Sequence, residues 1–287
     1  MNIEDIRKEI LNFMNNSGLN RVSEEVAFTP DLVDMEMYED IIIGVCKADD
    51  EYLKLLANDK KLEERKSFSQ LELPDYWLED AKSIISVFFR FSERVRVSNR
   101  GGDEPSREWL HARIQGQEFL NALSKHIETV MTENGSPTIA PTLDKKHKVI
   151  GIEDKNAPSG LRLASNWSER HVAFATGIGT FSLSDSFISE IGAAGRLTSF
   201  ITTMEFPPEI YNDKEHTPDN IYDNCNMCGV CVKNCPVNAI TLEKGHDHKP
   251  CSDLLDRIEE KNPPYYGCGK CQTKAPCETQ IPKARAK

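Results

Sequence analysis

Eight of the nine cysteines in this chain lie between residues 225 and 277. The first four, with the residue that follows them, have the spacing C-x2-C-x2-C-x3-C-P: Cys225, Cys228, Cys231, Cys235 and Pro236. This is the known spacing of bacterial [4Fe–4S] proteins, in which three closely spaced thiolates bind one cube and the fourth binds another. Because proline suits the first position of a helix, we expect a short helix to begin after Cys235.

The remaining cysteines can complete two clusters. A lone Cys251 follows a polar loop, Cys268 and Cys271 form a C-x2-C pair, and the last is Cys277. Two cubes need eight thiolates, and eight are present. We assign to the first cluster Cys225, Cys228, Cys231 and Cys277, and to the second Cys235, Cys251, Cys268 and Cys271. Each cluster then joins the beginning of the segment to its end, so metal binding would fold this part of the chain.

Zinc and disulfides are the alternatives to iron–sulfur clusters. Structural zinc sites usually use two C-x2-C pairs, and three cysteines at successive x2 spacing followed by C-P do not match this pattern. Disulfides require an oxidising compartment, and the N-terminal sequence has neither an apolar signal core nor a twin arginine. We therefore expect two [4Fe–4S] clusters in a reducing cytoplasm. The ninth cysteine, Cys46, follows an apolar run and is interpreted as a buried, inert thiol.

The composition predicts a folded protein of 287 residues, with 39% hydrophobic and 28% charged residues. The net charge of −11 argues against nucleic-acid binding through a broad basic surface. No run of about 18 apolar residues is present, so we expect no membrane-spanning helix.

Hydrophobic periodicity predicts alternating helices and strands in the first two thirds of the chain. The predicted helices cover residues 3–16, 49–66, 109–131 and 166–176. The predicted strands cover residues 41–45, 84–91, 149–152 and 196–206. Residues 92–108 are predicted to form a loop. A polar, proline-containing stretch at 209–221 marks the boundary between an α/β domain, residues 1–215, and a small ferredoxin-like domain, residues 216–287.

Few other side chains suggest chemistry. The catalytic candidates are His111 and His171, both on predicted helices, where packed histidines are equally expected. For His246 and His248, which flank Asp247, we favour a solvated turn over a metal site, since the eight cysteines already account for metal.

One segment resembles a known superfamily. Residues 169–179 (E-R-H-V-A-F-A-T-G-I-G) resemble the E-R-x-x-A-x-x-A-G-L-G-like stretch of epoxyqueuosine reductases and reductive dehalogenases. The Y-G-C-x-x-C-Q motif at residues 266–272 and the order of the eight cysteines also match. The resemblance is firm over residues 165–277 and faint before them.

The resemblance implies a nitroreductase-like α/β domain that holds cobalamin and receives electrons from two [4Fe–4S] clusters. A ferredoxin or flavodoxin would be the electron donor, and an unassigned small molecule would lose an oxygen or a halogen. Its motif makes four residues cofactor-binding candidates: Glu169, Arg170, Gly177 and Gly179. In this setting the protein would supply orientation and protons, and the cofactor the difficult chemistry.

Three positions depart from the family. Leu163 stands where epoxyqueuosine reductases have a catalytic aspartate, and a leucine cannot donate a proton. Cys277 is reached after five residues instead of three, and Glu278 replaces a proline.

From the cysteine spacing and the resemblance together, we predict an iron–sulfur oxidoreductase, a cobalamin-dependent reductase of unassigned substrate. The alternatives are an electron carrier or corrinoid-handling protein with no substrate of its own, and a flavin in the same pocket.

Overall fold

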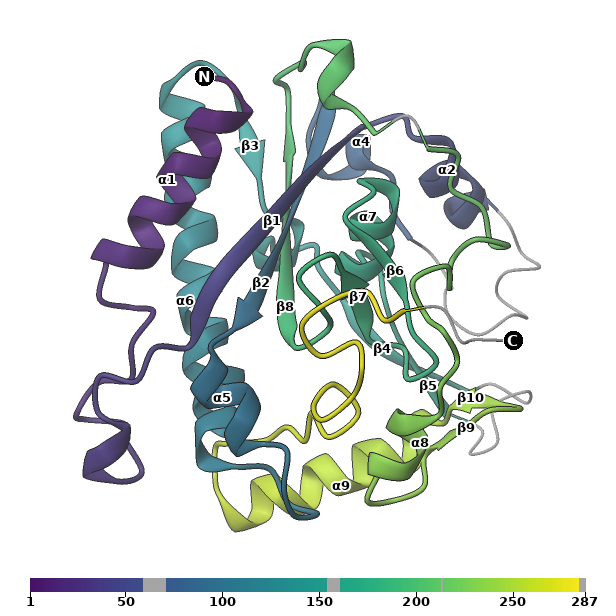
Figure 1. Cartoon of the computed structure of the whole chain (residues 1–287). Helices are drawn as coiled ribbons and strands as arrows, with labels where there is room; N and C mark the ends of the chain where they lie inside the picture. Colours follow the sequence, from purple (N-terminus) through teal and green to yellow (C-terminus); the bar gives the residue numbers. More distant parts are fainter. Residues whose placement is uncertain (59–70, 154–160, 213, 284–287) are drawn as a thin grey trace.

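A four-stranded antiparallel sheet lies at the centre of the computed structural model, which describes residues 1–58, 71–153, 161–212 and 214–283 (Figure 1). In spatial order its strands are β1 (Tyr38–Lys47), β2 (Ser83–Phe91), β8 (Gly195–Thr202) and β3 (Thr138–Ile139). Both strands predicted at 41–45 and 84–91 are confirmed. Strand β8 ends earlier than the strand predicted over 196–206. The reason is that the Thr202 hydroxyl accepts a hydrogen bond from the backbone of Met204 and turns the chain.

The central strand β2 is buried on both faces. Ile85, Val87 and Phe89 belong to one hydrophobic cluster, whereas Ile84 and Phe88 belong to the other. This two-residue alternation places successive side chains in different cores. A nearly continuous apolar sequence is therefore what a strand covered on both sides requires.

Helices cover both faces of the sheet (Figure 1). On one face, α1 (Ile3–Asn16) and α6 (Arg107–Glu133) pack into the cluster that contains Phe89. On the other, α2 (Glu51–Asn58) and α7 (Glu169–Ala175) pack into the cluster that contains Phe88. The fold class predicted from the sequence, mixed α/β, is confirmed.

The predicted helices agree with the structure to different degrees. The helix predicted over 3–16 is α1, and α6 extends the one predicted over 109–131. Only the first part of the helix predicted over 49–66 can be compared, as residues 59–66 lie outside the described residues. The helix α7 begins later than predicted, because the side chain of Asn166 bonds the backbone of Lys146 and Lys148 and holds an extended connection.

The loop predicted over residues 92–108 is wrong in part, because it contains helix α5 (Glu93–Ser98). The Ser92 hydroxyl accepts a hydrogen bond from the backbone of Val95, as a helix N-cap does. The polar composition concealed this helix. Its buried Arg96 pairs with Glu39 and Glu278, both far away in sequence.

Short elements complete the α/β part. These elements are α4 (Pro74–Trp77), β4 (Val149–Glu153), β5 (Leu161–Ser165), β6 (Gly179–Phe181) and β7 (Phe187–Ser189). The strand predicted at 149–152 is confirmed as β4, which pairs with β5 in antiparallel orientation. The predicted burial of Cys46 is confirmed, and burial raises the pKa of its thiol well above the usual value.

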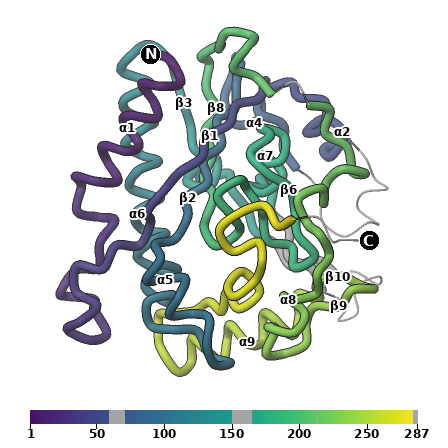
Figure 2. Tube along the Cα trace, viewed as in Figure 1, coloured from purple at the N-terminus to yellow at the C-terminus, as the bar shows by residue number. Residues whose placement is uncertain are grey.

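The cysteine-rich segment contains α8 (Val230–Asn234), β9 (Ile240–Thr241), β10 (Gly245–His246) and α9 (His248–Lys261). The helix expected to begin after Cys235 is wrong, because α8 precedes that residue. Gly229 starts α8 from a left-handed conformation, with φ of 73°. After α9 the chain returns across the α/β part, where it lies in front of the sheet as the yellow segment of Figure 2.

No helix in the described part of the chain is long and apolar enough to cross a membrane. The proposed domain boundary at residues 215 and 216 stays a prediction.

The close contact between β1 and the residues that follow α7 provides a test of the fold. A Cβ on Gly44 would lie 2.4 Å from Cγ2 of Ile178 and 2.6 Å from the carbonyl oxygen of Thr176. Gly44→Ala should therefore lower the free energy of unfolding by about 1–3 kcal/mol, as overpacking does. Denaturant unfolding would measure this. Gly101→Ala is the control, because nothing lies within 4 Å of its added Cβ. Equal stability of the two variants would contradict the packing described here.

Candidate metal and cofactor site

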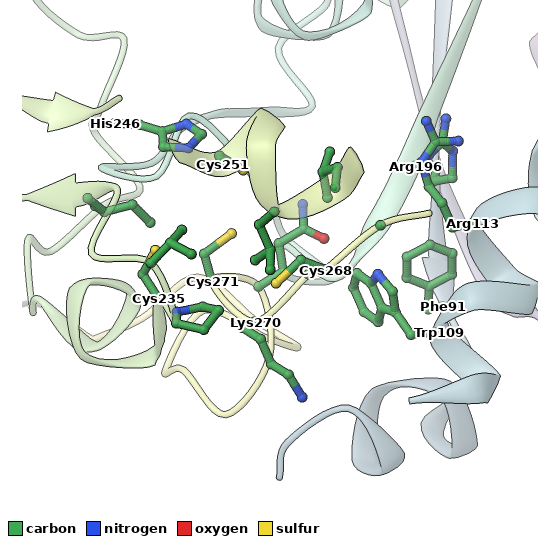
Figure 3. Close-up of a pocket in the computed structure, with 18 of the residues that line it drawn as sticks. Phe91, Trp109, Arg113, Arg196, Cys235, His246, Cys251, Cys268, Lys270 and Cys271 are labelled. Atoms are coloured by element: carbon green, nitrogen blue, oxygen red, sulfur yellow. The ribbon is translucent and has the colours of Figure 1, made fainter. Parts of the chain in front are cut away.

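The structure brings the eight clustered cysteines together as two sets of four. Around one cavity of about 210 Å³ lie Cys235, Cys251, Cys268 and Cys271 (Figure 3). Around a second, smaller cavity lie Cys225, Cys228, Cys231 and Cys277. These are the two ligand sets assigned from the sequence. Cys271 also borders the smaller cavity, so the two sets are adjacent.

The eight cysteines form no disulfide and are partly buried. Burial, with the neighbouring thiols as a second cause, raises the pKa of Cys231 to about 11 and that of Cys277 to about 12. Burial likewise raises the pKa of Cys251 to about 11. Iron ions would stabilise the thiolate form that these surroundings disfavour. The donor sets therefore fit two iron–sulfur clusters, although the assignment of each ligand remains a prediction.

The sulfur of Cys235 accepts a hydrogen bond from the backbone. The amide of Ala239 lies 3.2 Å from the Cys235 sulfur and donates a hydrogen bond to it. Hydrogen bonds to sulfur are among the interactions that set cluster reduction potentials.

The last cysteines are held against the α/β part by a buried ion pair. The Glu278 carboxylate lies 3.4 Å from a guanidinium nitrogen of Arg96 and 2.7 Å from one of Arg100. Its side chain is only 5% exposed. The adjacent carbonyl of Cys277 accepts a hydrogen bond from the backbone of Ala193. Glu278 therefore anchors the loop that carries Cys277.

A second pair of contacts holds the Cys268–Cys271 turn. The ammonium of Lys270 donates to the carbonyl oxygens of Asn99 and Gly101, at 3.0 and 2.6 Å. Gly269 has φ of +64°, and a Cβ there would overlap the ring of Trp109. This turn therefore requires glycine, and Trp109 forms part of its support.

A larger cavity of about 520 Å³ adjoins the Cys235–Cys251–Cys268–Cys271 set. The same residues line both this cavity and the cavity of about 210 Å³: Gly195, Arg196, His246, Cys251, Leu255, Cys271 and Gln272. In Figure 3 the cysteines lie on one side of the shared region, and Phe91, Trp109, Arg113 and Arg196 lie on the other. A molecule in the larger cavity would therefore be next to the second cluster.

Two of the four cofactor-binding candidates, Glu169 and Arg170, line this larger cavity. Burial raises the pKa of Glu169 to about 7, although Ser199 and the Arg196 charge act in the opposite direction. Glu169 therefore exchanges a proton near neutral pH. Arg170 donates a hydrogen bond to the carbonyl oxygen of Asp185.

Cationic side chains are concentrated where the cavities meet. Burial lowers the pKa of Arg113 to about 10, and the nearby charge of Arg196 adds to this effect. Arg113 donates a hydrogen bond to the Tyr266 hydroxyl at 2.6 Å, and its guanidinium lies 4.4 Å from that ring's centroid. Two adjacent, partly buried guanidiniums favour an anionic group in the space beside them.

The other two candidates, Gly177 and Gly179, border neither of these cavities. A Cβ on Gly177 would meet the amide of Asn212 at 2.4 Å, and one on Gly179 would meet the carbonyl oxygen of Ile188 at 2.2 Å. Both glycines permit close packing, which explains their place in the motif without a cofactor.

Neither catalytic candidate borders the described cavities. His111 is fully buried, accepts a hydrogen bond from the Phe28 backbone at Nε2, and bonds Gln115 through Nδ1. Nδ1 of His171 lies 2.6 Å from the Tyr52 hydroxyl, and burial lowers the pKa of this histidine to about 3. Both arrangements are typical of structural histidines.

The solvated turn expected at His246 and His248 is wrong. Their side chains are only 14% and 21% exposed, and both face Asp185, more than 60 residues earlier in sequence. All three line the larger cavity. Asp185 carries no sequence signal of its own, so only the fold reveals this group.

Comparison with known proteins agrees with the site. Residues 219–241 match the family model described as a 4Fe-4S binding domain. An epoxyqueuosine reductase from Bacillus anthracis is 25% identical over 219 residues, which cover 71% of this chain and 50% of that protein. The chain is similar to epoxyqueuosine reductases. The chain spans about half the length of the curated epoxyqueuosine reductases that it matches.

Two solved structures are also similar. Epoxyqueuosine reductase from Bacillus subtilis gives a TM-score of 0.45 at 16% identity, over 98% of this chain and 68% of that one. A catabolic reductive dehalogenase gives 0.48 at 14% identity, over 84% and 30%. The resemblance stated from the sequence is confirmed by the curated relative, and a 4Fe-4S binding segment is present.

The two-set arrangement predicts the iron content of cysteine variants. Cys225→Ser and Cys268→Ser should each retain about four irons per chain, whereas the unchanged protein should hold about eight. Anaerobic metal analysis and the visible spectrum would measure this. Cys46→Ala is the control and should keep the full iron content, since Cys46 lies in the core. Full iron in both serine variants would contradict the assignment.

The raised pKa of Glu169 predicts a pH dependence of stability. Between its ordinary value of 4.5 and about 7, the folded chain retains a proton that the unfolded chain releases. The free energy of unfolding should therefore fall as pH rises through this window, by on the order of 3 kcal/mol. Glu169→Gln should remove this decline and be the more stable protein at pH 8.

Melting temperatures between pH 5 and 8 would provide the measurement. Glu133→Gln, an exposed substitution, is the matched control and should follow the unchanged protein. Parallel curves for Glu169→Gln and the unchanged protein would show that Glu169 ionises normally.

Proposed function

We propose that this protein is an iron–sulfur reductase in which two [4Fe–4S] clusters deliver electrons to cobalamin in the larger cavity. The observation that carries the proposal is the wall that this cavity shares with the Cys235–Cys251–Cys268–Cys271 set. A ferredoxin or flavodoxin would supply the electrons. The substrate would be a small organic molecule that loses an oxygen or a halogen.

The polar lining of the larger cavity is chemically suited to cobalamin. Hydrogen-bonding side chains on its wall are Arg170, Ser184, Ser186, Arg196 and Gln272. These groups could hold the amide side chains at the edge of a corrin. When bound, cobalamin would supply a low-valent cobalt that reduces the substrate bond. The apolar part of the wall, including Phe88 and Phe187, would exclude water from the ring.

Glu169 is our proposed proton source. The aspartate of epoxyqueuosine reductases is replaced by Leu163 here, so the family's donor is missing. Glu169 belongs to the same cavity wall, and its pKa of about 7 lets it hold and release a proton at neutral pH. Asp185, also on this wall, has its pKa held well below the usual range. Burial opposes this shift, but His246, His248 and Arg170 outweigh it.

Arg196 and Arg113 would orient an anionic group of the ligand. Arg196 borders both cavities, and Gln117 accepts a hydrogen bond from its guanidinium, which holds the side chain in place. A fixed cation beside the cofactor would stabilise negative charge that develops when the substrate is reduced.

The second candidate function is an electron carrier or corrinoid-handling protein that consumes no substrate. The leucine at position 163 favours it, because this reading needs no proton donor there.

An anaerobic titration with cobalamin tests the proposal. Binding should change the visible spectrum to that of the base-off form, and Arg196→Ala should weaken binding about tenfold. That loss corresponds to about 1.4 kcal/mol. Arg94→Ala is the control, because this arginine pairs with Asp31 and Glu108 away from the cavities. Binding without turnover of organic acceptors by a low-potential donor would favour corrinoid handling, and no spectral change would favour an electron carrier.

A further inference from the structure

Asp185, His246 and His248 bring three metal-binding atoms to one place on the wall of the larger cavity. Nε2 of His248 lies 3.2 Å from Oδ2 of Asp185, and Nδ1 of His246 lies 3.5 Å from the same oxygen. All three atoms lie within 4.8 Å of one another. In a tetrahedral zinc site with bonds of 2.0–2.1 Å, ligand atoms are about 3.4 Å apart. The two shorter separations have this spacing.

A hydrogen bond accounts for the contact of Asp185 with His248 but not for its contact with His246. His248 and Asp185 form a hydrogen bond. Nδ1 of His246 is buried, and among the described residues it has no hydrogen-bond partner, although a carboxylate oxygen lies 3.5 Å away. A buried nitrogen and a carboxylate oxygen at this distance need a well-aligned proton or a cation between them. A metal ion at the centre of the group would satisfy both.

The backbone holds the three residues in place without the ion. Asp185 occupies a tight turn with φ of 58°, and its amide donates to the carbonyl of Ser182. His246 is paired with Ile240 in the β9–β10 hairpin. His248 is the first residue of α9, directly after the capping Asp247. Ligands on such fixed elements lose little conformational entropy when an ion binds.

Two histidines and one carboxylate define the class of ion. Imidazole nitrogen favours zinc and the late first-row metals over magnesium and calcium, which prefer oxygen. Three protein ligands also leave positions for water or a substrate, as catalytic zinc and ferrous sites do. We propose that Asp185, His246 and His248 bind one divalent transition-metal ion, for which zinc is the reference, with its open position toward the larger cavity.

The neighbouring charges set limits on the affinity. Arg170, which donates to the carbonyl oxygen of Asp185, places a positive charge close to the site and opposes a second cation. The negative charge of the Asp185 carboxylate, 3.2 Å from Nε2 of His248, offsets this repulsion. The bound ion could polarise an oxygen of a molecule in the cavity. It would also connect the β6–β7 turn to the cysteine-rich segment.

Zinc binding to the chelator-washed, cluster-loaded protein tests this site. After one equivalent of zinc and dialysis, metal analysis should find about one zinc per chain with iron unchanged. X-ray absorption at the zinc edge should show nitrogen and oxygen neighbours near 2.0–2.1 Å. His246→Ala and Asp185→Asn should each weaken zinc binding at least tenfold. His126→Ala is the matched control, since its ring pairs with a single carboxylate, Glu9.

Three results would overturn the site. These are no retained zinc, sulfur neighbours near 2.3 Å that show zinc in the cysteine sites, or equal zinc binding by the unchanged protein and both variants. If one variant loses its iron and misfolds, the zinc-edge spectrum of the unchanged protein still decides. The cobalamin titration is a separate measurement, so either proposal can fail without the other.

Discussion

The buried carboxylate of Glu278 joins the end of the described chain to its α/β part. Its partners Arg96 and Arg100 belong to the α5 region, which follows the central strand directly. An ion pair this deeply buried contributes little net stability over an apolar packing, but removing one partner costs about 3–5 kcal/mol. Its effect is therefore positional: it determines where the returning segment lies, and with it the last ligand of the first cysteine set.

The rest of the site depends on this closure. The sheet supplies a rigid wall, because β2 is buried on both faces and β8 pairs along most of its length. Arg196 of this sheet lines both cavities, and Glu169 of α7 lines the larger one. The opposite wall comes from α9 and the returning segment. Neither part alone lines the larger cavity, so this cavity exists only when the two parts are in contact.

The sequence predicted the elements whose signals are local. The apolar runs of β1 and β2, the periodicity of α1 and α6, and the cysteine spacing all concern neighbouring residues. The structure accordingly agrees there. The cysteines of the two assigned sets also line two adjacent cavities, because a metal-binding pattern contains information about contacts that distant residues must make; which thiol binds which cluster stays a prediction.

The features that the sequence did not predict depend on contacts between residues far apart in the chain. Helix α5 was taken for a loop because its Arg96 is stabilised by carboxylates that lie far away in sequence. Asp185 was overlooked since an aspartate in a serine-rich turn is ordinary until two histidines face it. Cofactor binding by Gly177 and Gly179 stays a prediction, and the close approach of a neighbouring segment to each glycine is a second role that the sequence does not indicate. Long-range contacts of this kind cannot be read from spacing.

The position of the second cysteine set has a consequence for biogenesis. Cys251 and Cys271 belong to the wall of the larger cavity, so a cluster held by these thiols would itself form part of that wall. Under the proposed function, a cofactor would then be loaded after the cluster is assembled. Oxidative loss of the cluster would open the cavity, and the chain would lose the electron source and the bound cofactor in one event.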